Sequence, residues 1–117
     1  MDAVIIMDGI LILDKPLGMT SHDCVNEARR AFKTRKVGHS GTLDPEASGV
    51  LVLAINQATK ILEFLNQDDK AYRFTVRFNL TTDTLDHTGE IINRNLGASI
   101  DGLDDVLATF AGTYLQT

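Results

Sequence analysis

Cysteine is almost absent from this sequence, and its scarcity excludes two ways of stabilising a small fold. The single cysteine, Cys24, has no partner for an internal disulfide bond. No other Cys or His completes with it the ligand spacing of a zinc site. We therefore expect Cys24 to be a small, buried hydrophobic residue.

Long apolar runs and targeting signals are also lacking. No stretch approaches the roughly 20 apolar residues that a membrane-spanning helix needs, and the first residues lack the positive region and cleavage site of a secretory signal. The composition, 44% hydrophobic and 23% charged, is typical of a soluble globular protein. We expect a cytoplasmic protein without a membrane partner, and its 117 residues allow at most one domain with a usable core.

The chain has no overall positive charge, since its formal net charge is −5. It therefore does not hold nucleic acid by bulk charge, which needs clustered Lys and Arg. Five cations nevertheless fall within eight residues without an acid among them: Arg29, Arg30, Lys33, Arg35 and Lys36. Such a run is usually the solvated end of a helix, where cations suit the helix dipole. The alternative is a surface that contacts phosphates.

The first half of the chain predicts two strands with a helix between them. The apolar runs 10–13 and 50–55 are short enough for buried strands. Thr20 or Ser21 can cap the helix, and Asp23 stands three residues after Thr20, as in a capping box. Hydrophobic residues then lie on one helical face: Val25, Ala28 and Phe32.

The second half continues the mixture of helices and strands. Segment 58–65 has the helical period, whereas 70–78 alternates cleanly and gives the strongest strand signal in the chain. A turn-rich stretch, 81–90, precedes the apolar pair Ile91 and Ile92. A last helix is predicted over 101–110, with Gly112 placed to end it. This order predicts an α+β fold, a mixed sheet with packed helices. The chain stops soon after that helix without a closing polar tail, which resembles a cut through a larger domain.

The glycine-rich loop 38–49 carries the most distinctive polar residue, Asp44. Because Pro45 follows it, steric clash confines Asp44 to an extended backbone, and this fixes the direction of its carboxylate. The ordinary interpretation is a helix start, with Asp44 as the cap and Glu46 in the first turn. That interpretation leaves unexplained the glycines on both sides, which let a backbone or ligand approach closely. They are Gly38, Gly41 and Gly49.

Three further residues have both an ordinary and a functional interpretation. His39, five residues before Asp44, is either a hydrogen-bonding loop residue or part of a site. Tyr72 begins the apolar face of its predicted strand, so it is either a core residue or a ring that stacks on an unpaired base. Lys15 is either a solvated turn residue or a support for the site.

Five segments, in this order and at this spacing, resemble successive motifs of the TruB family of pseudouridine synthases. They are GILILDKPLGMTSHD, GHSGTLDPEASGVLVLAI, ATKILEFL, KAYRFTVRF and TDTLDHTGEI. The likeness leaves 1–8 as an N-terminal extension and makes 9–117 the N-terminal part of a pseudouridine synthase catalytic domain. The catalytic subunit of box H/ACA particles shares the Asp44 loop, but TDTLDHTGE is more similar to the bacterial tRNA enzymes.

The resemblance implies an isomerase that converts uridine to pseudouridine in the T-loop of tRNA. Asp44 would be the nucleophile that attacks a flipped-out uridine. Tyr72 would be the second catalytic residue, which stacks on the flipped base and takes part in proton transfer. His39 would hold the T-loop region and Lys15 would support the site. Arg73, with Arg77 and the basic run, becomes a candidate for phosphate contacts. The family uses neither metal nor organic cofactor, and we expect a monomer when the protein is full length.

The resemblance also implies that these 117 residues are incomplete. The family's catalytic domain continues past the position of Thr117 into a segment that supplies an arginine paired with the aspartate, and a C-terminal RNA-binding domain follows. Burial can raise the pKa of a carboxylate by about 3–5, and an adjacent arginine lowers it by about 1–3. We therefore expect the fragment alone to be poorly active.

Two other functions stay open on the residues alone. A non-catalytic module for structured RNA would use the same basic run. A metal-dependent hydrolase would require His39, Asp44, Asp83, Asp86 and His87 to converge, although they show no recognisable ligand pattern. A phosphate-binding loop is weaker still, because GHSGT lacks the lysine and spacing of a Walker motif.

Overall fold

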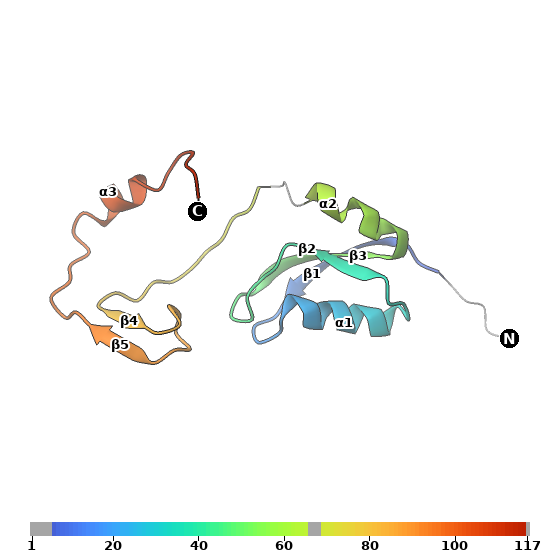
Figure 1. Cartoon of the computed structure of the whole chain (residues 1–117), viewed down its shortest axis with the longest axis horizontal. Coiled ribbons are helices and arrows are strands. Elements are labelled where there is room, and N and C mark those ends of the chain that lie inside the picture. Colours follow the sequence, from blue (N-terminus) through green and yellow to red (C-terminus); the bar gives the residue numbers. More distant parts are fainter. Residues whose placement is uncertain (1–5, 66–68, 117) are drawn as a thin grey trace. The chain divides into compact units, whose positions relative to one another are not determined.

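The computed structural model describes residues 6–65 and 69–116 of the chain. Contacts between residues separate it into two compact units, Met1–Lys70 and Ala71–Thr117 (Figure 1). Helices and antiparallel strands are both present, which confirms the α+β class. All the pairings described are antiparallel, so the expected mixture of strand directions is not seen among them. The unit boundary falls inside 9–117, and assigning that span to one catalytic domain stays a prediction.

The first unit is built on a three-stranded sheet in the order β1-β3-β2. The strands are β1 (Gly9–Lys15), β2 (Val37–Ser40) and β3 (Gly49–Ile55). The central strand β3 contains the longer apolar run, and most of its residues are buried, as predicted. Strand β1 is also confirmed, but it lies at the edge of the sheet, and its exposed Ile10 and Ile12 alternate with partly buried neighbours. Its burial is therefore one-sided rather than complete.

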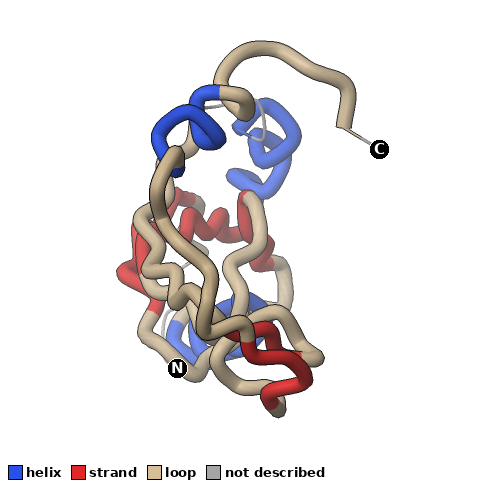
Figure 2. Tube along the Cα trace, turned by 90° about the vertical axis from the view of Figure 1, so that its left-hand side faces the viewer, coloured by secondary structure: helices blue, strands red, loops and turns tan. Residues whose placement is uncertain are grey.

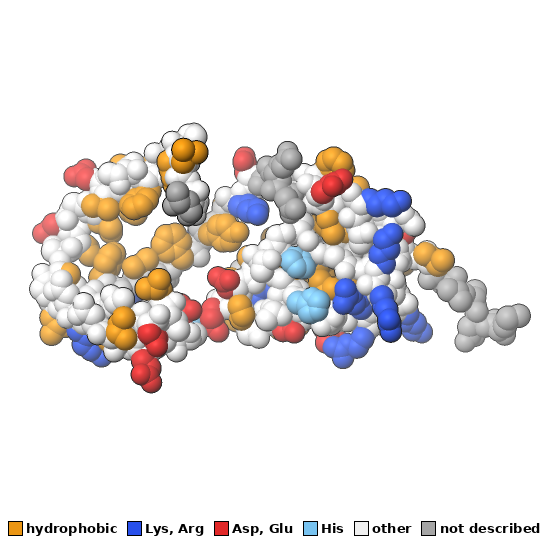
Figure 3. Space-filling view, viewed as in Figure 1, with side chains coloured by type: hydrophobic (Ala, Val, Ile, Leu, Met, Phe, Trp, Pro, Cys, Tyr) orange, Lys and Arg blue, Asp and Glu red, His pale blue; other side chains and the backbone are white. Residues whose placement is uncertain are grey.

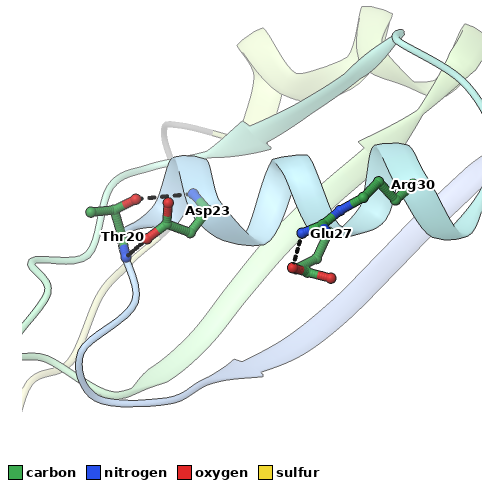
Figure 4. A network of polar contacts seen from close by, with 4 residues as sticks. All are labelled: Thr20, Asp23, Glu27 and Arg30. Atoms are coloured by element: carbon green, nitrogen blue, oxygen red, sulfur yellow. Dashed lines mark hydrogen bonds and ion pairs between the residues drawn. The ribbon is translucent and has the colours of Figure 1, made fainter.

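Helix α1 (Ser21–Ala31) begins where the capping box predicted. Thr20 is the N-cap: its hydroxyl accepts from the Asp23 amide and its own amide donates to the Asp23 carboxylate, each at 2.9 Å (Figure 4). Val25 and Ala28 are buried in the core, and Cys24 is buried beside them, as expected. Capping satisfies amides that the first helical turn would otherwise leave unpaired.

A short helical segment follows β3 directly. It starts as a 3-10 helix, η1 (Asn56–Ile61), and continues as α2 (Leu62–Leu65). The predicted helix over 58–65 is thus confirmed, although its first half has the tighter geometry. The end of the N-terminal extension joins this segment, because Asn56 Nδ2 donates to the Met7 carbonyl at 2.7 Å and the Gln57 amide to Asp8 at 2.9 Å. Residues 1–5 lie outside the described part.

The second unit contains a hairpin and one short helix. Strands β4 (Leu80–Thr82) and β5 (Ile91–Arg94) pair with each other, and β4 takes up the first two residues of the predicted turn-rich stretch 81–90. Helix α3 (Leu103–Ala108) confirms the last predicted helix with shorter bounds. Long loop segments join these short elements, as the tan tube of Figure 2 shows for much of the chain. Across the described residues, no helix has the length and apolar character needed to cross a membrane.

The predicted strand over 70–78 is wrong. These residues form neither helix nor strand, and every one of them is exposed. The apolar side chains of the alternating pattern, among them Phe74 and Val76, face solvent. Alternation determines which face a strand would bury, but a strand also needs a hydrogen-bonded neighbour. None of the described residues supplies that neighbour.

The turn of the hairpin is organised by Asp86. Its Oδ1 accepts hydrogen bonds from the Thr84 hydroxyl at 2.7 Å and the Thr88 amide at 2.8 Å, and also contacts the Thr88 hydroxyl. These hydrogen bonds favour the ionised carboxylate, Thr88 most strongly, and lower the pKa of Asp86 to about 2.

We predict that this turn loosens only in strong acid. Because the folded pKa of Asp86 lies below its ordinary value of 3.8, the stabilisation is complete above that value and disappears as the pH falls toward about 2. An NMR titration of the carboxyl carbon and of the Thr84 and Thr88 amides measures this. Asp86→Asn should remove the titration, and a midpoint at the ordinary value would contradict the prediction.

Candidate active-site loop

Asp44 lies in the loop 41–48, which joins β2 to β3. Since Lys15 pairs with Gly49 in the β1–β3 ladder, the turn 16–20 that leaves β1 emerges at the same end of the sheet as this loop. The Ala47 amide donates to the Asp44 carbonyl at 2.9 Å and closes a turn. No helix follows, so the interpretation of Asp44 and Pro45 as a helix start is wrong.

The backbone is anchored on both sides of Asp44. On one side, the Ser21 hydroxyl accepts from the Leu43 amide at 2.9 Å and donates to the Leu43 carbonyl at 3.2 Å. On the other side, the Gly18 amide donates to the Pro45 carbonyl at 2.7 Å. The Asp44 side chain is exposed, and it makes no hydrogen bond or ion pair with the described residues. A fixed backbone thus presents an accessible carboxylate.

Lys15 supports the turn that provides the second of these anchors. Its side chain is fully buried, and Nζ donates to the carbonyls of Pro16 at 2.9 Å and Met19 at 2.6 Å. Burying an ammonium group is costly unless hydrogen bonds compensate for the lost water. The interpretation of Lys15 as a solvated turn residue is therefore wrong. A contact between Lys15 and substrate stays a prediction.

His39 lies at the start of the same region, but in β2 rather than in the loop where we expected it. It pairs with Leu53 across the ladder and is partly buried. Its Nδ1 contacts the Gly41 carbonyl. A carbonyl oxygen only accepts, so this contact is a hydrogen bond when Nδ1 carries the proton.

The glycines in and beside the loop have different structural roles. A Cβ at Gly38 would lie 2.7 Å from Leu62 Cδ1, so its absence lets α2 pack closely against β2. Gly41 and Gly49 have φ angles of +75° and +143°, which L side chains rarely adopt. The Lys70 ammonium also lies at this loop, 3.6 Å from where a Gly41 Cβ would stand. Sequence reasoning missed Lys70, because its only signal was its position at the start of an alternating segment.

Tyr72 and Arg73 belong to the second unit, in the segment 70–78 that forms no strand. Both are exposed, and 65% of Tyr72 is accessible, so its interpretation as a core residue is wrong. The first unit thus brings Lys15 and the Asp44 loop to one end of its sheet, whereas His39 pairs with Leu53, further along β3. The site roles of Tyr72 and Arg73 stay predictions.

The described residues include no group of three or more His, Cys, Asp or Glu that could hold a metal ion. Of the residues named for a metal-dependent hydrolase, Asp86 accepts hydrogen bonds within its turn, and Asp83 accepts one from the Glu90 amide at 2.9 Å. Both carboxylates thus stabilise the hairpin. Their hydrogen bonds give no support to the metal-dependent hydrolase alternative.

The five cations of 29–36, which we call the basic cluster, lie at the last turn of α1 and in the connection to β2. Blue side chains gather over this end of the first unit in Figure 3. Arg30 forms an ion pair with Glu27 (Figure 4), and Arg29 donates to the Arg35 carbonyl at 3.0 Å. The other three side chains are exposed and have no acidic partner among the described residues: Lys33, Arg35 and Lys36.

Comparison with known proteins places the chain in a family. Residues 29–117 match the model of the TruB family pseudouridylate synthase, N-terminal domain. The chain belongs to this family, as its motifs indicated. It is 52% identical over 112 residues to tRNA pseudouridine synthase B of Syntrophotalea carbinolica, and 51% identical over 113 residues to that of Oceanobacillus iheyensis. Each match covers 94% of the chain but only 37% of the relative.

We predict that Lys15→Met destabilises the first unit. Methionine fills similar space but leaves the carbonyls of Pro16 and Met19 without a donor, which should lower the free energy of unfolding by about 1–3 kcal/mol. Urea denaturation measures this, with the exposed Lys60→Met as the control. Equal stability of the two variants would contradict the assigned role of Lys15.

Proposed function

We propose that this chain is the N-terminal part of the catalytic domain of a tRNA pseudouridine synthase that isomerises uridine in the T-loop. The family assignment and the names of the relatives support the reaction class. The observation that carries the proposal is the accessible Asp44 carboxylate, whose flanking backbone is anchored by Gly18 and Ser21. A nucleophile must be reachable by its substrate yet held in place, and Asp44 meets both conditions.

The chemistry fits a carboxylate that works without a co-reactant. In the proposed reaction Asp44 attacks the target nucleotide, the uracil detaches and rotates, and it is reattached through carbon. Uridine and pseudouridine have the same atoms, so no oxidant, reductant or second substrate is consumed. A stacked uridine is out of reach of a side chain, and the target base must therefore flip out of the RNA.

Other residues are proposed to receive the flipped nucleotide. Tyr72 offers an exposed ring, and stacking of a base on an aromatic ring contributes roughly 1–3 kcal/mol. His39, which is partly buried, is proposed to help hold the T-loop region. Lys15 acts from the buried side by organising the turn beside Asp44, and Arg73 is proposed to contact the RNA backbone.

The basic cluster is proposed to contact phosphates of the tRNA. Phosphate contacts position an RNA without requiring a protein that is positive overall. Lys33, Arg35 and Lys36 suit this role because no acidic side chain among the described residues neutralises them. The cluster therefore reconciles RNA binding with a net charge of −5.

We further propose that residues 1–117 turn over poorly by themselves, since the match covers only 37% of the relatives named for this activity. The suitable test protein is a chimera in which residues 1–117 replace the matching part of the Syntrophotalea carbinolica enzyme. This chimera should form pseudouridine in a T-stem-loop RNA, whereas the 117-residue chain should be much slower.

Asp44→Asn in the chimera is predicted to abolish turnover and keep RNA affinity, because the amide preserves shape but is no nucleophile. Pseudouridine formation and RNA binding are measured in parallel, with the exposed Asp14→Asn as the matched control. If Asp44→Asn retains turnover, Asp44 is not the nucleophile. If the parent chimera binds RNA but never forms pseudouridine, the chain is instead a non-catalytic RNA-binding module.

Removing charge from the basic cluster should weaken RNA binding without changing its sequence preference. For Lys33→Ala and Lys36→Ala in the chimera, we predict that the slope of log affinity against log salt falls by about 1 for each lost phosphate contact. Arg94→Ala, on β5, is the control for loss of one exposed charge. An unchanged salt slope in the cluster variants would contradict a phosphate contact.

A further inference from the structure

Thr20 and Ser21 are adjacent hydroxyl residues with different tasks. Thr20 is exposed and caps α1 through the Asp23 amide. Ser21 is the first residue of the helix and is only 2% exposed. Its hydroxyl contacts the distant Leu43, 22 residues along the chain, as donor and as acceptor. Ser21 therefore joins the start of α1 to the loop that carries Asp44.

Leu43 is a suitable point at which to fix this loop. Its side chain packs against the core cluster, while its amide and carbonyl are both paired with the Ser21 hydroxyl. Its carbonyl carbon is bonded to the Asp44 nitrogen, so the peptide plane that leads into Asp44 is held directly. Pro45 restricts the Asp44 backbone from the other side. The backbone of Asp44 is thus restricted on both sides, whereas its side-chain torsions are not.

We propose that Ser21 is a positioning residue for the Asp44 carboxylate. The inference rests on the proposed role of Asp44 as nucleophile and adds a residue that orders it without touching substrate. Loss of the hydroxyl leaves the Leu43 amide and carbonyl unpaired in a partly buried place, and the loop then shifts to find new partners. A displacement of about 1 Å at a reacting group can reduce a rate by about 100-fold.

The adjacent Thr20 offers a matched control for this role. Thr20→Ala removes a hydroxyl one residue away and weakens the helix cap, but it leaves both bonds to Leu43 in place. A purely structural role for Ser21 would make Ser21→Ala resemble Thr20→Ala, with lower stability and unchanged chemistry. A positioning role predicts instead that the two variants differ in kcat.

The experiment compares both variants in the chimera. For Ser21→Ala we expect kcat for pseudouridine formation to fall by roughly 10- to 100-fold, with KM for the T-stem-loop RNA unchanged, because the buried hydroxyl does not face the RNA. Thr20→Ala should lower the unfolding temperature and keep kcat. Hydrogen exchange of the Ala47 amide, which closes the turn at Asp44, should accelerate in Ser21→Ala and not in Thr20→Ala.

A second pair of variants covers the case in which Ser21→Ala does not fold. Ser21→Thr and Ser21→Val have the same shape and differ only in the hydroxyl, so we expect the threonine variant to have the higher kcat. Equal kcat in this pair, or a Ser21→Ala variant with the kcat of the parent chimera, overturns the inference. Asp44→Asn separates failure of this inference from failure of the proposed function. If Asp44→Asn retains turnover, the proposed function fails. If Asp44→Asn abolishes turnover but Ser21→Ala does not reduce it, only the role of Ser21 fails.

Discussion

The hydrogen bonds between the turn 16–20, the start of α1 and the loop 41–48 are the constraint on which the proposed site depends. They are possible because β1 and β3 pair with Lys15 opposite Gly49, which brings the two connections to one end of the sheet. A carboxylate in a polar, glycine-containing loop would ordinarily be mobile, since such loops have few apolar contacts. Here Gly18 and Ser21 fix the backbone on either side of Asp44, and the carboxylate itself stays accessible.

The buried Lys15 shows how the interior supports this arrangement. A lysine is rarely buried completely without compensation. Its ammonium group donates to two carbonyls of the following turn. These hydrogen bonds hold the backbone of that turn close to the end of β1. The Gly18 amide, which lies between the two bonded residues, is thereby presented to the Pro45 carbonyl. A residue with no accessible surface thus shapes the exposed side of the site.

The parts of the fold that depend on local sequence were predictable. The capping box at Thr20, the apolar run of β3 and the turn-rich stretch before β5 each specify their structure within a few residues. The failures involve distant partners. Segment 70–78 has the pattern of a strand but no hydrogen-bonded neighbour among the described residues. The cap-like sequence after Asp44 forms a turn, and its Pro45 carbonyl accepts from the distant Gly18 amide.

The candidate site was likewise predictable only where local sequence identifies its residues. Asp44 and Lys15 could be named from the motifs, but the burial of Lys15 could not, since nothing in its local sequence distinguishes a buried lysine from a solvated one. Ser21 was missed for a related reason. Thr20 and Ser21 both suit a helix cap, and only the three-dimensional position of Leu43 shows that the second hydroxyl serves another loop.

The two polar features of the first unit lie at opposite ends of α1, and this separation limits what the proposed substrate can be. The Asp44 loop is bonded to the first residue of the helix, whereas the basic cluster occupies its last turn and the connection beyond. Eleven residues at a rise of 1.5 Å make α1 about 16 Å long. If the proposed function holds, a ligand that has its reacting atom at Asp44 and a phosphate at the cluster extends along α1. An RNA suits this arrangement better than a free nucleotide.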